Sequence, residues 1–192
     1  GMDTRAITKH IRSAGAMKAI LSTEELDRDR LVEKAKTSPG LIGRDLVKEV
    51  TCERPFPWTG RNDSQFLSHP SPPSTTPFRP KVVALDYGVK YNILRSLCDW
   101  NCEVTVLPAS SSADRVLSYR PDGILLSNGP GDPEGIPYAI ETVRQLIGKK
   151  PIFGICLGHQ LLGLALGGKT FKLKFGHRGA NQPVKDLRTG KV

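Results

Sequence analysis

The C-terminal part of the sequence alternates between short apolar runs and longer amphipathic stretches, and no other feature constrains the fold as strongly. Apolar runs of about 4–8 residues are typical of buried strands, whereas apolar residues at three-to-four spacing indicate helices. The pattern predicts strands at 81–86, 102–107, 123–126 and 151–155 and helices at 91–100, 113–119, 138–147 and 157–166. Such alternation is typical of parallel sheets with helices on both faces. We therefore predict an α/β fold with an open, mostly parallel sheet, which binds ligands at the carboxyl ends of its strands.

A proline-rich stretch divides the chain of 192 residues. Residues 54–80 hold seven of the 15 prolines and show no sustained apolar period. Proline removes a backbone donor and blocks helices. On composition alone, we interpret 55–80 as a linker between part of a smaller α/β domain at 1–54 and a larger domain at 81–192.

The N-terminal piece carries its own local signals. Asp3 can cap a helix that ends near residue 13, and a capping box that begins at Ser22 predicts a second helix to about residue 36. Residues 17–21 predict a short strand, and 44–48 predict a last short helix. A piece of about 55 residues is marginally stable alone, so we expect it to pack on something else or to belong to a larger domain.

Composition excludes several classes of protein. Hydrophobic residues make up 38% and charged residues 24%, which is sufficient for a core and argues against whole-chain disorder. No apolar run approaches the roughly 18 residues that span a bilayer, and the first residues form no hydrophobic signal region. The four cysteines are too few and too scattered for a disulfide scaffold or a zinc site. We expect a reduced, cytoplasmic protein with no metal and no membrane partner.

The net charge of +9 raises the possibility of a nucleic-acid partner. From residue 169 onward, seven residues are Lys or Arg and one is acidic. Recognition of nucleic acid needs a basic face with stacking or groove-reading elements, and this tail has only Phe171 and Phe175 as aromatics. We interpret it as solvated or as facing a protein partner, and expect no nucleic acid.

Cys156 stands in the run GICLGHQ, which a predicted strand enters and an apolar helix leaves. Nucleophile elbows use such a strand-to-helix turn, and flanking glycines permit its tight backbone. The helix N-terminus favours a thiolate, and its N–H groups can stabilise an oxyanion. A free cysteine is ordinarily a small buried hydrophobe. We keep that interpretation for Cys52, Cys98 and Cys102, whereas the elbow favours a nucleophile at Cys156.

A second loop, SNGPGDP at 127–133, follows another buried strand. Two glycines and two prolines give it an unusual backbone path whose N–H and C=O groups can face a ligand. Alone it would be an ordinary turn. Its place at the same sheet edge as Cys156 favours a functional interpretation.

Three runs together carry a family resemblance: SNGPGDP, FGICLGHQ and KFGHRGANQPVKD. The second resembles the elbow of class I glutamine amidotransferases, a family that also makes anthranilate, aminodeoxychorismate, GMP and CTP. All three together resemble the small, glutamine-hydrolysing subunits of carbamoyl phosphate synthetases. The runs DTRAITKHIRSAG and SPGLIGRDLVKEV resemble the later part of the amino-terminal domain of those subunits.

The resemblance implies a function and a set of site residues. Cys156 would attack the side-chain amide of L-glutamine and form a thioester, with the oxyanion held by the N–H of Leu157 and helped by Gly129. Gly129, Gly131, Leu157 and Gln160 match positions that contact glutamine. Ammonia would pass to a large synthetase subunit, which uses ATP and bicarbonate, so this chain itself needs no cofactor. The amino-terminal domain would help to bind that subunit.

The family's catalytic base, a His in an H-P-E motif, has no counterpart among the four histidines. We therefore expect the chain to be a fragment, truncated at its C-terminus, that is inactive or weakly active. His159, three residues after Cys156, is a weak candidate for the base, because its helix carries it away from the nucleophile. Two alternatives stay open: a non-catalytic module that docks on a synthetase subunit, and a cysteine hydrolase with another substrate.

Overall fold

The computed structural model describes residues 2–61, 78–174, 176 and 183–192. The chain forms two compact units, one of Gly1–Gly40 with Phe171–Val192 and the other of Leu41–Thr170. These bounds differ from the predicted division, since residues 41–54 fall in the same unit as the sheet. The predicted domains at 1–54 and 81–192 rest on composition and stay a prediction.

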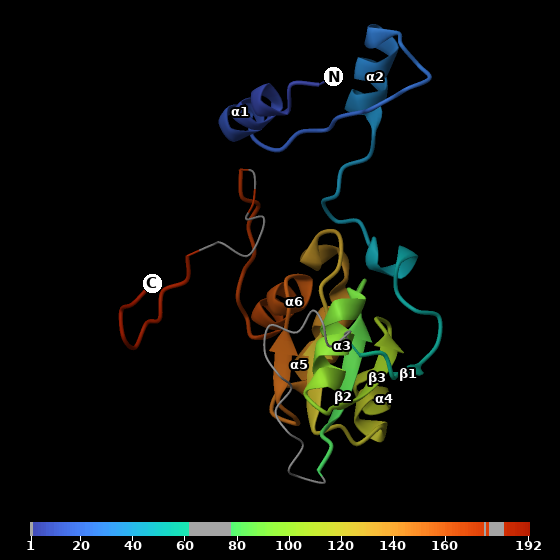
Figure 1. Ribbon diagram of the computed structural model, residues 1–192, viewed down its shortest axis with the longest axis vertical. Coiled ribbons are helices and arrows are strands. Elements are labelled where there is room, and N and C mark those ends of the chain that lie inside the picture. The colour runs from blue at the N-terminus through green and yellow to red at the C-terminus, as the bar shows by residue number, and fades with distance from the viewer. Residues whose placement is uncertain (1, 62–77, 175, 177–182) are drawn as a thin grey trace. The chain divides into compact units, whose positions relative to one another are not determined.

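The unit Leu41–Thr170 is built on a five-stranded sheet in the order β1-β3-β2-β4-β5 (Figure 1). The strands are β1 (Phe56–Trp58), β2 (Lys81–Asp86), β3 (Glu103–Pro108), β4 (Gly123–Leu126) and β5 (Ile152–Gly154). Four of them are parallel, and β1 pairs antiparallel with β3. The predicted α/β fold with a mostly parallel sheet is confirmed, and each predicted strand of the larger domain is present with its ends shifted by one residue at most.

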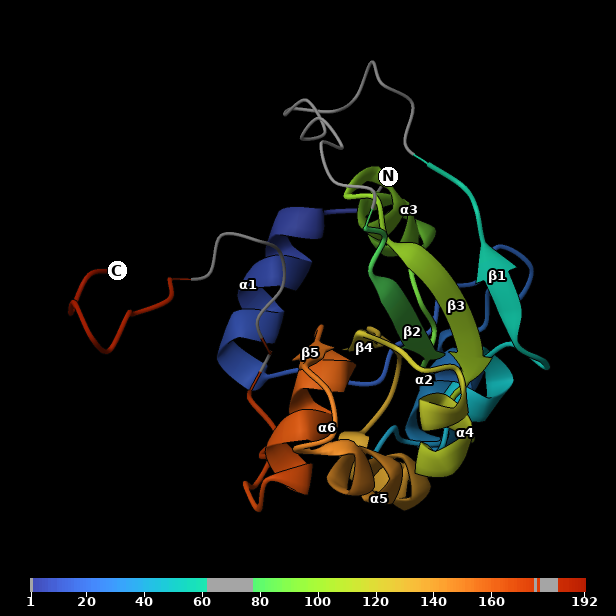
Figure 2. The ribbon, with the colours of Figure 1, turned by 90° about the horizontal axis from the view of Figure 1, so that it is seen from below.

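Helices cover both faces of this sheet (Figure 2). They are α3 (Tyr91–Asp99), α4 (Ala113–Ser118), α5 (Pro137–Leu146) and α6 (Leu157–Ala165). Alternate residues of a strand point to opposite faces, so β2 contributes to two cores. Val83 and Leu85 pack with α4, α5 and α6, whereas Ala84 packs with Leu94 and Cys98 of α3.

The order of the strands places a switch point beside β2. The chain leaves β2 through α3 to reach β3 on one side, and then crosses through α4 to β4 on the other side. The loops that follow β2 and β4 therefore diverge at the carboxyl edge of the sheet, where open α/β sheets bind their ligands.

The interpretation of 55–80 as a linker is wrong for Phe56–Trp58, which form β1. This strand lies at the edge of the sheet, where a proline such as Pro57 is tolerated because part of the strand needs no ladder partner. The ring of Trp58 lies 4.9 Å from that of Tyr91 on α3, which holds the strand in place. The predicted linker residues 62–77 lie outside the described part of the chain.

The unit of Gly1–Gly40 and Phe171–Val192 contains α1 (Thr4–Ala14) and α2 (Arg28–Thr37). The cap at Asp3 is confirmed, since its carboxylate accepts from the N–H of Ala6 at 2.9 Å. The helix predicted from Ser22 begins only at Arg28. Ser22 Oγ accepts from the N–H groups of Glu24 and Glu25 in a turn, and Asp27 is the residue that caps the helix.

Two further elements predicted near the N-terminus are wrong. Residues 17–21 form no strand, because no ladder of backbone bonds follows the single bond from Ala16 N–H to Lys174 O among the described residues. The helix predicted at 44–48 is a single 3₁₀ turn, η1 (Val47–Glu49). Local apolar runs are insufficient for a strand, because a strand is stable only beside a partner.

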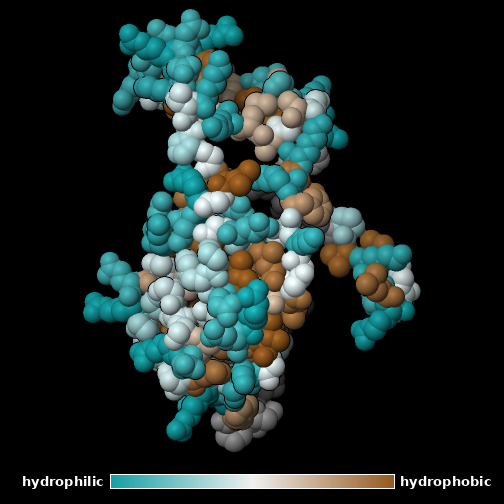
Figure 3. Space-filling model, turned by 180° about the vertical axis from the view of Figure 1, so that it is seen from behind, coloured by the Kyte–Doolittle hydropathy of each residue, from teal (hydrophilic) through white to brown (hydrophobic). Residues whose placement is uncertain are grey.

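The edge of the sheet at β5 is apolar. Phe153 is 67% exposed, and Leu166, just after α6, is 66% exposed. Figure 3 shows apolar residues gathered on one side of the sheet unit.

In the part of the chain that the structure describes, no helix is long and apolar enough to cross a membrane.

Candidate active site

Cys156 lies between β5 and α6, as the cap residue of that helix. Its backbone has φ 51° and ψ −108°, a conformation that L-residues rarely adopt and that functional turns tolerate. Its side chain is exposed. The predicted strand-to-helix turn is therefore present, with the thiol at its apex and open to solvent.

Two glycines make this turn possible by permitting close backbone contacts. A Cβ at Gly154 would lie 2.6 Å from the N of His159. A Cβ at Gly158 would overlap the carbonyl O of Leu126 and lie 2.5 Å from its carbonyl C. Side chains at these positions would separate α6 from β5 and β4, so the glycines of the GICLGHQ run serve close packing.

The remaining three cysteines differ from Cys156 in their surroundings. Burial, with the nearby Asp86 carboxylate, raises the pKa of the Cys52 thiol to about 11. Burial also raises the pKa of Cys98 and of Cys102. A thiol with a pKa near 11 is roughly 0.1% thiolate at pH 8, and the thiolate is the reactive form. The interpretation of these three as inert is consistent with this chemistry.

The loop 127–133 is joined directly to the elbow. Ser127 is fully buried, and its carbonyl O accepts the N–H of Gly158 at 3.0 Å. Its hydroxyl accepts from the N–H of Tyr87 at 2.9 Å and donates to the carbonyl of Asn128 at 2.8 Å. The ends of β2 and β4 and the start of α6 therefore meet at one serine.

Gly129 packs against the residue that follows the nucleophile. A Cβ at Gly129 would overlap the carbonyl O of Tyr87 and lie 2.7 Å from Leu157 Cδ2. Among the described residues, the N–H groups of Gly129 and Leu157 donate to no acceptor. Two adjoining segments beside Cys156 therefore carry unpartnered N–H groups, which is what an oxyanion site requires.

The other two predicted site residues, Gln160 and Gly131, are exposed. Gln160 is exposed in the first turns of α6, and its N–H donates to the Cys156 carbonyl at 3.0 Å. Gly131 is exposed with φ 90°, and a Cβ there would lie 3.5 Å from the carbonyl O of Arg44, with no elbow atom among the nearest. The structure thus brings together Cys156, Leu157 and Gly129, and leaves Gly131 at the outer end of the loop.

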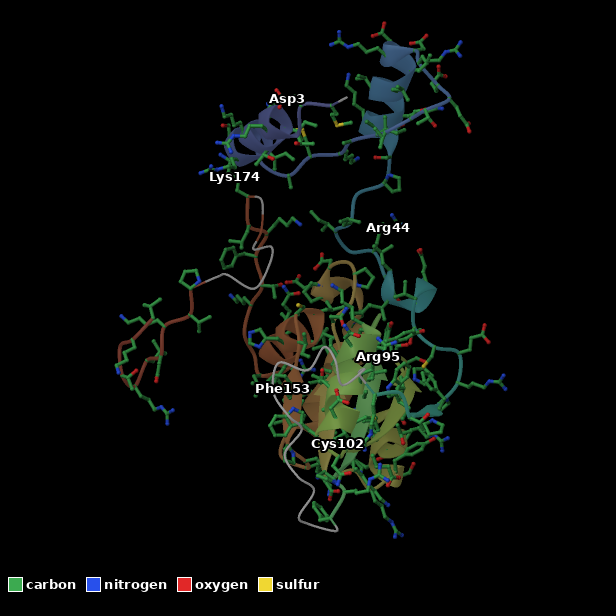
Figure 4. All side chains as sticks on the ribbon, in the orientation of Figure 1. Asp3, Arg44, Arg95, Cys102, Phe153 and Lys174 are labelled. Carbon is green, nitrogen blue, oxygen red and sulfur yellow. The ribbon has the colours of Figure 1, made fainter. Side chains whose placement is uncertain are left out.

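A cavity of about 540 Å³ lies at the end of β2, and sequence reasoning missed it. It is lined by Val50, Asp86, Gly88, Val89, Lys90, Tyr91, Asn92 and Arg95; Arg95 is labelled in Figure 4. Asp86 Oδ1 accepts the N–H groups of Gly88 and Val89 and so shapes its wall. The available signal was an aspartate at the end of a strand with a glycine two residues later, Asp86 and Gly88.

Asn128 links this cavity to the loop 127–133. Its Oδ1 accepts the N–H of Lys90 at 3.1 Å, and its Nδ2 donates to the carbonyl of Gly88 at 2.9 Å. Both loops at the switch point are therefore fixed to one another.

Comparisons with known proteins find one matching family and several similar proteins. The family described as glutamine amidotransferase class-I matches residues 83–192. A carbamoyl phosphate synthase small chain from Syntrophotalea carbinolica is 58% identical over 192 residues, which are 100% of this chain and 50% of that protein. Similar proteins of that name occur in Rhodopirellula baltica (53% identical, 100% of this chain and 51% of that protein) and, as a chloroplastic form, in Oryza sativa subsp. japonica (50% identical, 100% and 42%).

The chain spans about half the length of these curated relatives. The match to the family begins within β2 and covers β3, β4, β5, the loop 127–133 and the elbow at Cys156. On the strength of that match, the chain belongs to the class I glutamine amidotransferase family.

Proposed function

We propose that this chain carries the nucleophile and the oxyanion donors of a glutaminase that supplies ammonia for carbamoyl phosphate synthesis. The observation that carries the proposal is the exposed Cys156 at a strand-to-helix turn, beside N–H groups of Leu157 and Gly129 that have no acceptor in the described part of the chain. The family match and the names of the relatives support the substrate class and the pathway step.

The proposed reaction has two halves. Cys156 Sγ bonds to the carboxamide carbon of L-glutamine, and the negative charge that develops on the carboxamide oxygen is held by the N–H groups of Leu157 and Gly129. The C–N bond then breaks, and ammonia leaves with the proton of the thiol. Water next attacks the thioester, which releases glutamate and restores the thiol.

The proposed partner is a large synthetase subunit that receives the ammonia and uses ATP and bicarbonate. The small-chain names of the relatives support such a partner. Gly131 and Gln160 are proposed as further contacts to glutamine, and their exposure leaves them accessible to it. Cytoplasmic location and the absence of a nucleic-acid partner stay predictions.

We further propose that this chain alone turns glutamine over slowly or not at all, because neither histidine of the described residues forms a hydrogen bond or ion pair with a carboxylate that would orient it as the base. His10 is exposed on α1, and His159 is exposed in the first turn of α6. His69 and His177 lie outside the described residues. Proton transfer by a positioned base contributes about 10²–10⁴-fold to a rate, so its loss leaves acylation slow.

Alkylation by a glutamine-like chloroketone tests the proposal, because its ketone oxygen takes the position of the carboxamide oxygen while Sγ displaces chloride. The thiol proton passes to water, so no residue has to protonate a leaving amine. We expect one adduct per chain, on Cys156, at a rate that saturates with reagent and falls when L-glutamine is added. We expect Cys52, Cys98 and Cys102 to react slowly at pH 8, since burial raises their pKa. Peptide mass mapping identifies the site.

Two controls accompany this experiment. Cys156→Ser removes the adduct, and iodoacetamide, which has no glutamine portion, reacts with Cys156 without saturation. Alkylation of Cys156 that L-glutamine does not slow would instead support an interaction module or a hydrolase for another substrate. Sustained glutamate release from this chain at rates of about 1 per second or more, ordinary for enzymes, would refute the proposed slow turnover.

A further inference from the structure

Residues 41–52, here called the strap, cross the carboxyl edge of the sheet. At the end of β2, the N–H of Cys52 donates to Asp86 Oδ2 at 2.9 Å. Just after β3, Thr51 Oγ1 accepts the N–H of Ala109 at 2.9 Å. Beyond β4, the N–H of Gly43 donates to Asp132 Oδ2 at 3.0 Å. The strap therefore contacts the end of β2 and the segments that follow the neighbouring strands β3 and β4.

The strap is packed as well as hydrogen-bonded. Val47 is 1% exposed and belongs to the core formed with α4, α5 and α6. The carbonyl O of Arg44, a residue labelled in Figure 4, would lie 2.7 Å from a Cβ at Gly135. Any side chain at Gly135 would displace the strap, so the strap and the segment after β4 fit at backbone contact distance.

Asp132, a residue of the loop 127–133, connects this loop to the strap by hydrogen bonds. Its Oδ2 accepts from Gly43, and its Oδ1 accepts the N–H of Glu134 at 3.1 Å, which caps the 3₁₀ turn η3 (Pro133–Gly135). At the other end of the loop, Asn128 is held by Lys90 and Gly88. The backbone between them, Gly129 to Gly131, is fixed from both ends and keeps its N–H groups free among the described residues.

We propose that Asp132 is a positioning residue for glutamine, through which the strap holds Gly129 and Gly131 in place to receive the carboxamide. The inference rests on the proposed function. Asp132 does not touch the reacting atoms in this role. Its carboxylate accepts the N–H of Gly43, which is 89 residues away in sequence, and the N–H of Glu134, which is two residues away. Loss of either hydrogen bond releases the outer end of the loop 127–133.

Asp132→Ala and Asp132→Asn test the proposal by alkylation with the same chloroketone, analysed as the inhibitor constant KI and the maximal rate constant kinact. We expect Asp132→Ala to raise KI about tenfold, as loss of a charge-assisted hydrogen bond implies, with kinact changed less than about twofold. Asp132→Asn keeps one acceptor oxygen and recovers part of the affinity. The reaction of Cys156 with iodoacetamide stays unchanged in both variants.

Asp122→Ala is the matched control. Asp122 Oδ2 accepts the N–H of Lys81 at 2.8 Å at the opposite, amino-terminal edge of the sheet, so its loss removes a similar bond without touching the loop. Equal KI values for Asp132→Ala and Asp122→Ala would overturn the inference, as would a fall in kinact alone. Failure of the unsubstituted chain to show saturable alkylation would overturn the proposed function, and the inference with it.

Discussion

Gly158→Ala is expected to lower the free energy of unfolding of the sheet unit by about 3 kcal/mol, the upper range for overpacking a well-filled site. The new Cβ would overlap the carbonyl O of Leu126 and lie 2.6 Å from Leu126 Cβ. To relieve this overlap, α6 has to move away from β4. That movement also lengthens the hydrogen bond from Gly158 N–H to Ser127 O. Urea unfolding followed by tryptophan fluorescence measures the change, since both tryptophans lie in this unit.

Gly163→Ala is the control on the same helix. A Cβ at Gly163 would meet no atom of the described residues within 4 Å, and alanine is favoured over glycine inside a helix by about 1 kcal/mol. We expect this variant to be as stable as the unsubstituted chain or more stable. Equal unfolding midpoints for the two variants would contradict the close packing of α6 on β4.

Gly129→Ala is expected to lower the second-order rate constant for chloroketone alkylation of Cys156 by about 100-fold, as loss of an oxyanion donor does. The added methyl group would overlap the Tyr87 carbonyl and press on the Leu157 side chain. The loop must then withdraw and turn its N–H away from the thiol. Alkylation by iodoacetamide, which needs no oxyanion donor, is expected to change little.

Gly123→Ala, on the strand that leads to this loop, is the matched control. Its Cβ would make an ordinary contact, 3.9 Å from the carbonyl O of Pro151. We expect its alkylation rate to equal that of the unsubstituted chain. If the two variants were alkylated by the chloroketone at the same rate, the Gly129 N–H would be excluded as an oxyanion donor.

The sheet and the elbow were predictable from sequence because both are specified locally. Runs such as 82–85 are apolar on both faces, as strands buried between helix layers must be, and the helices between them show the three-to-four period. Cys156 between two glycines, at a strand-to-helix boundary, predicts a sharp turn without knowledge of the remainder of the chain.

The strap and β1 were not predictable in this way. Val47 is buried because residues far along the chain, in α5 and α6, cover it, and no periodicity near residue 47 signals that. Phe56–Trp58 become a strand because β3 offers an edge, although proline content there predicts a linker. Composition placed both segments outside the larger domain, whereas their long-range contacts place them in its unit.

The N-terminal errors have a related cause. The residues of the predicted capping box form a turn at Ser22, but the helix begins only after Asp27. The side chains of Ser22 and Asp27 each accept hydrogen bonds from two backbone N–H groups. Competing caps five residues apart have similar local energies, so a single sequence does not separate them.

The most direct test of Cys156 as the nucleophile is to capture its acyl adduct. The chain is incubated with the γ-methyl ester of L-glutamate, acid-quenched, digested and mapped by mass spectrometry. Sγ replaces the methoxy group of the ester, which takes the thiol proton and leaves as methanol. The predicted result is a γ-glutamyl thioester on the peptide that contains Cys156, and none in Cys156→Ser. No adduct at Cys156, or an adduct at Cys52, Cys98 or Cys102 instead, would contradict the account.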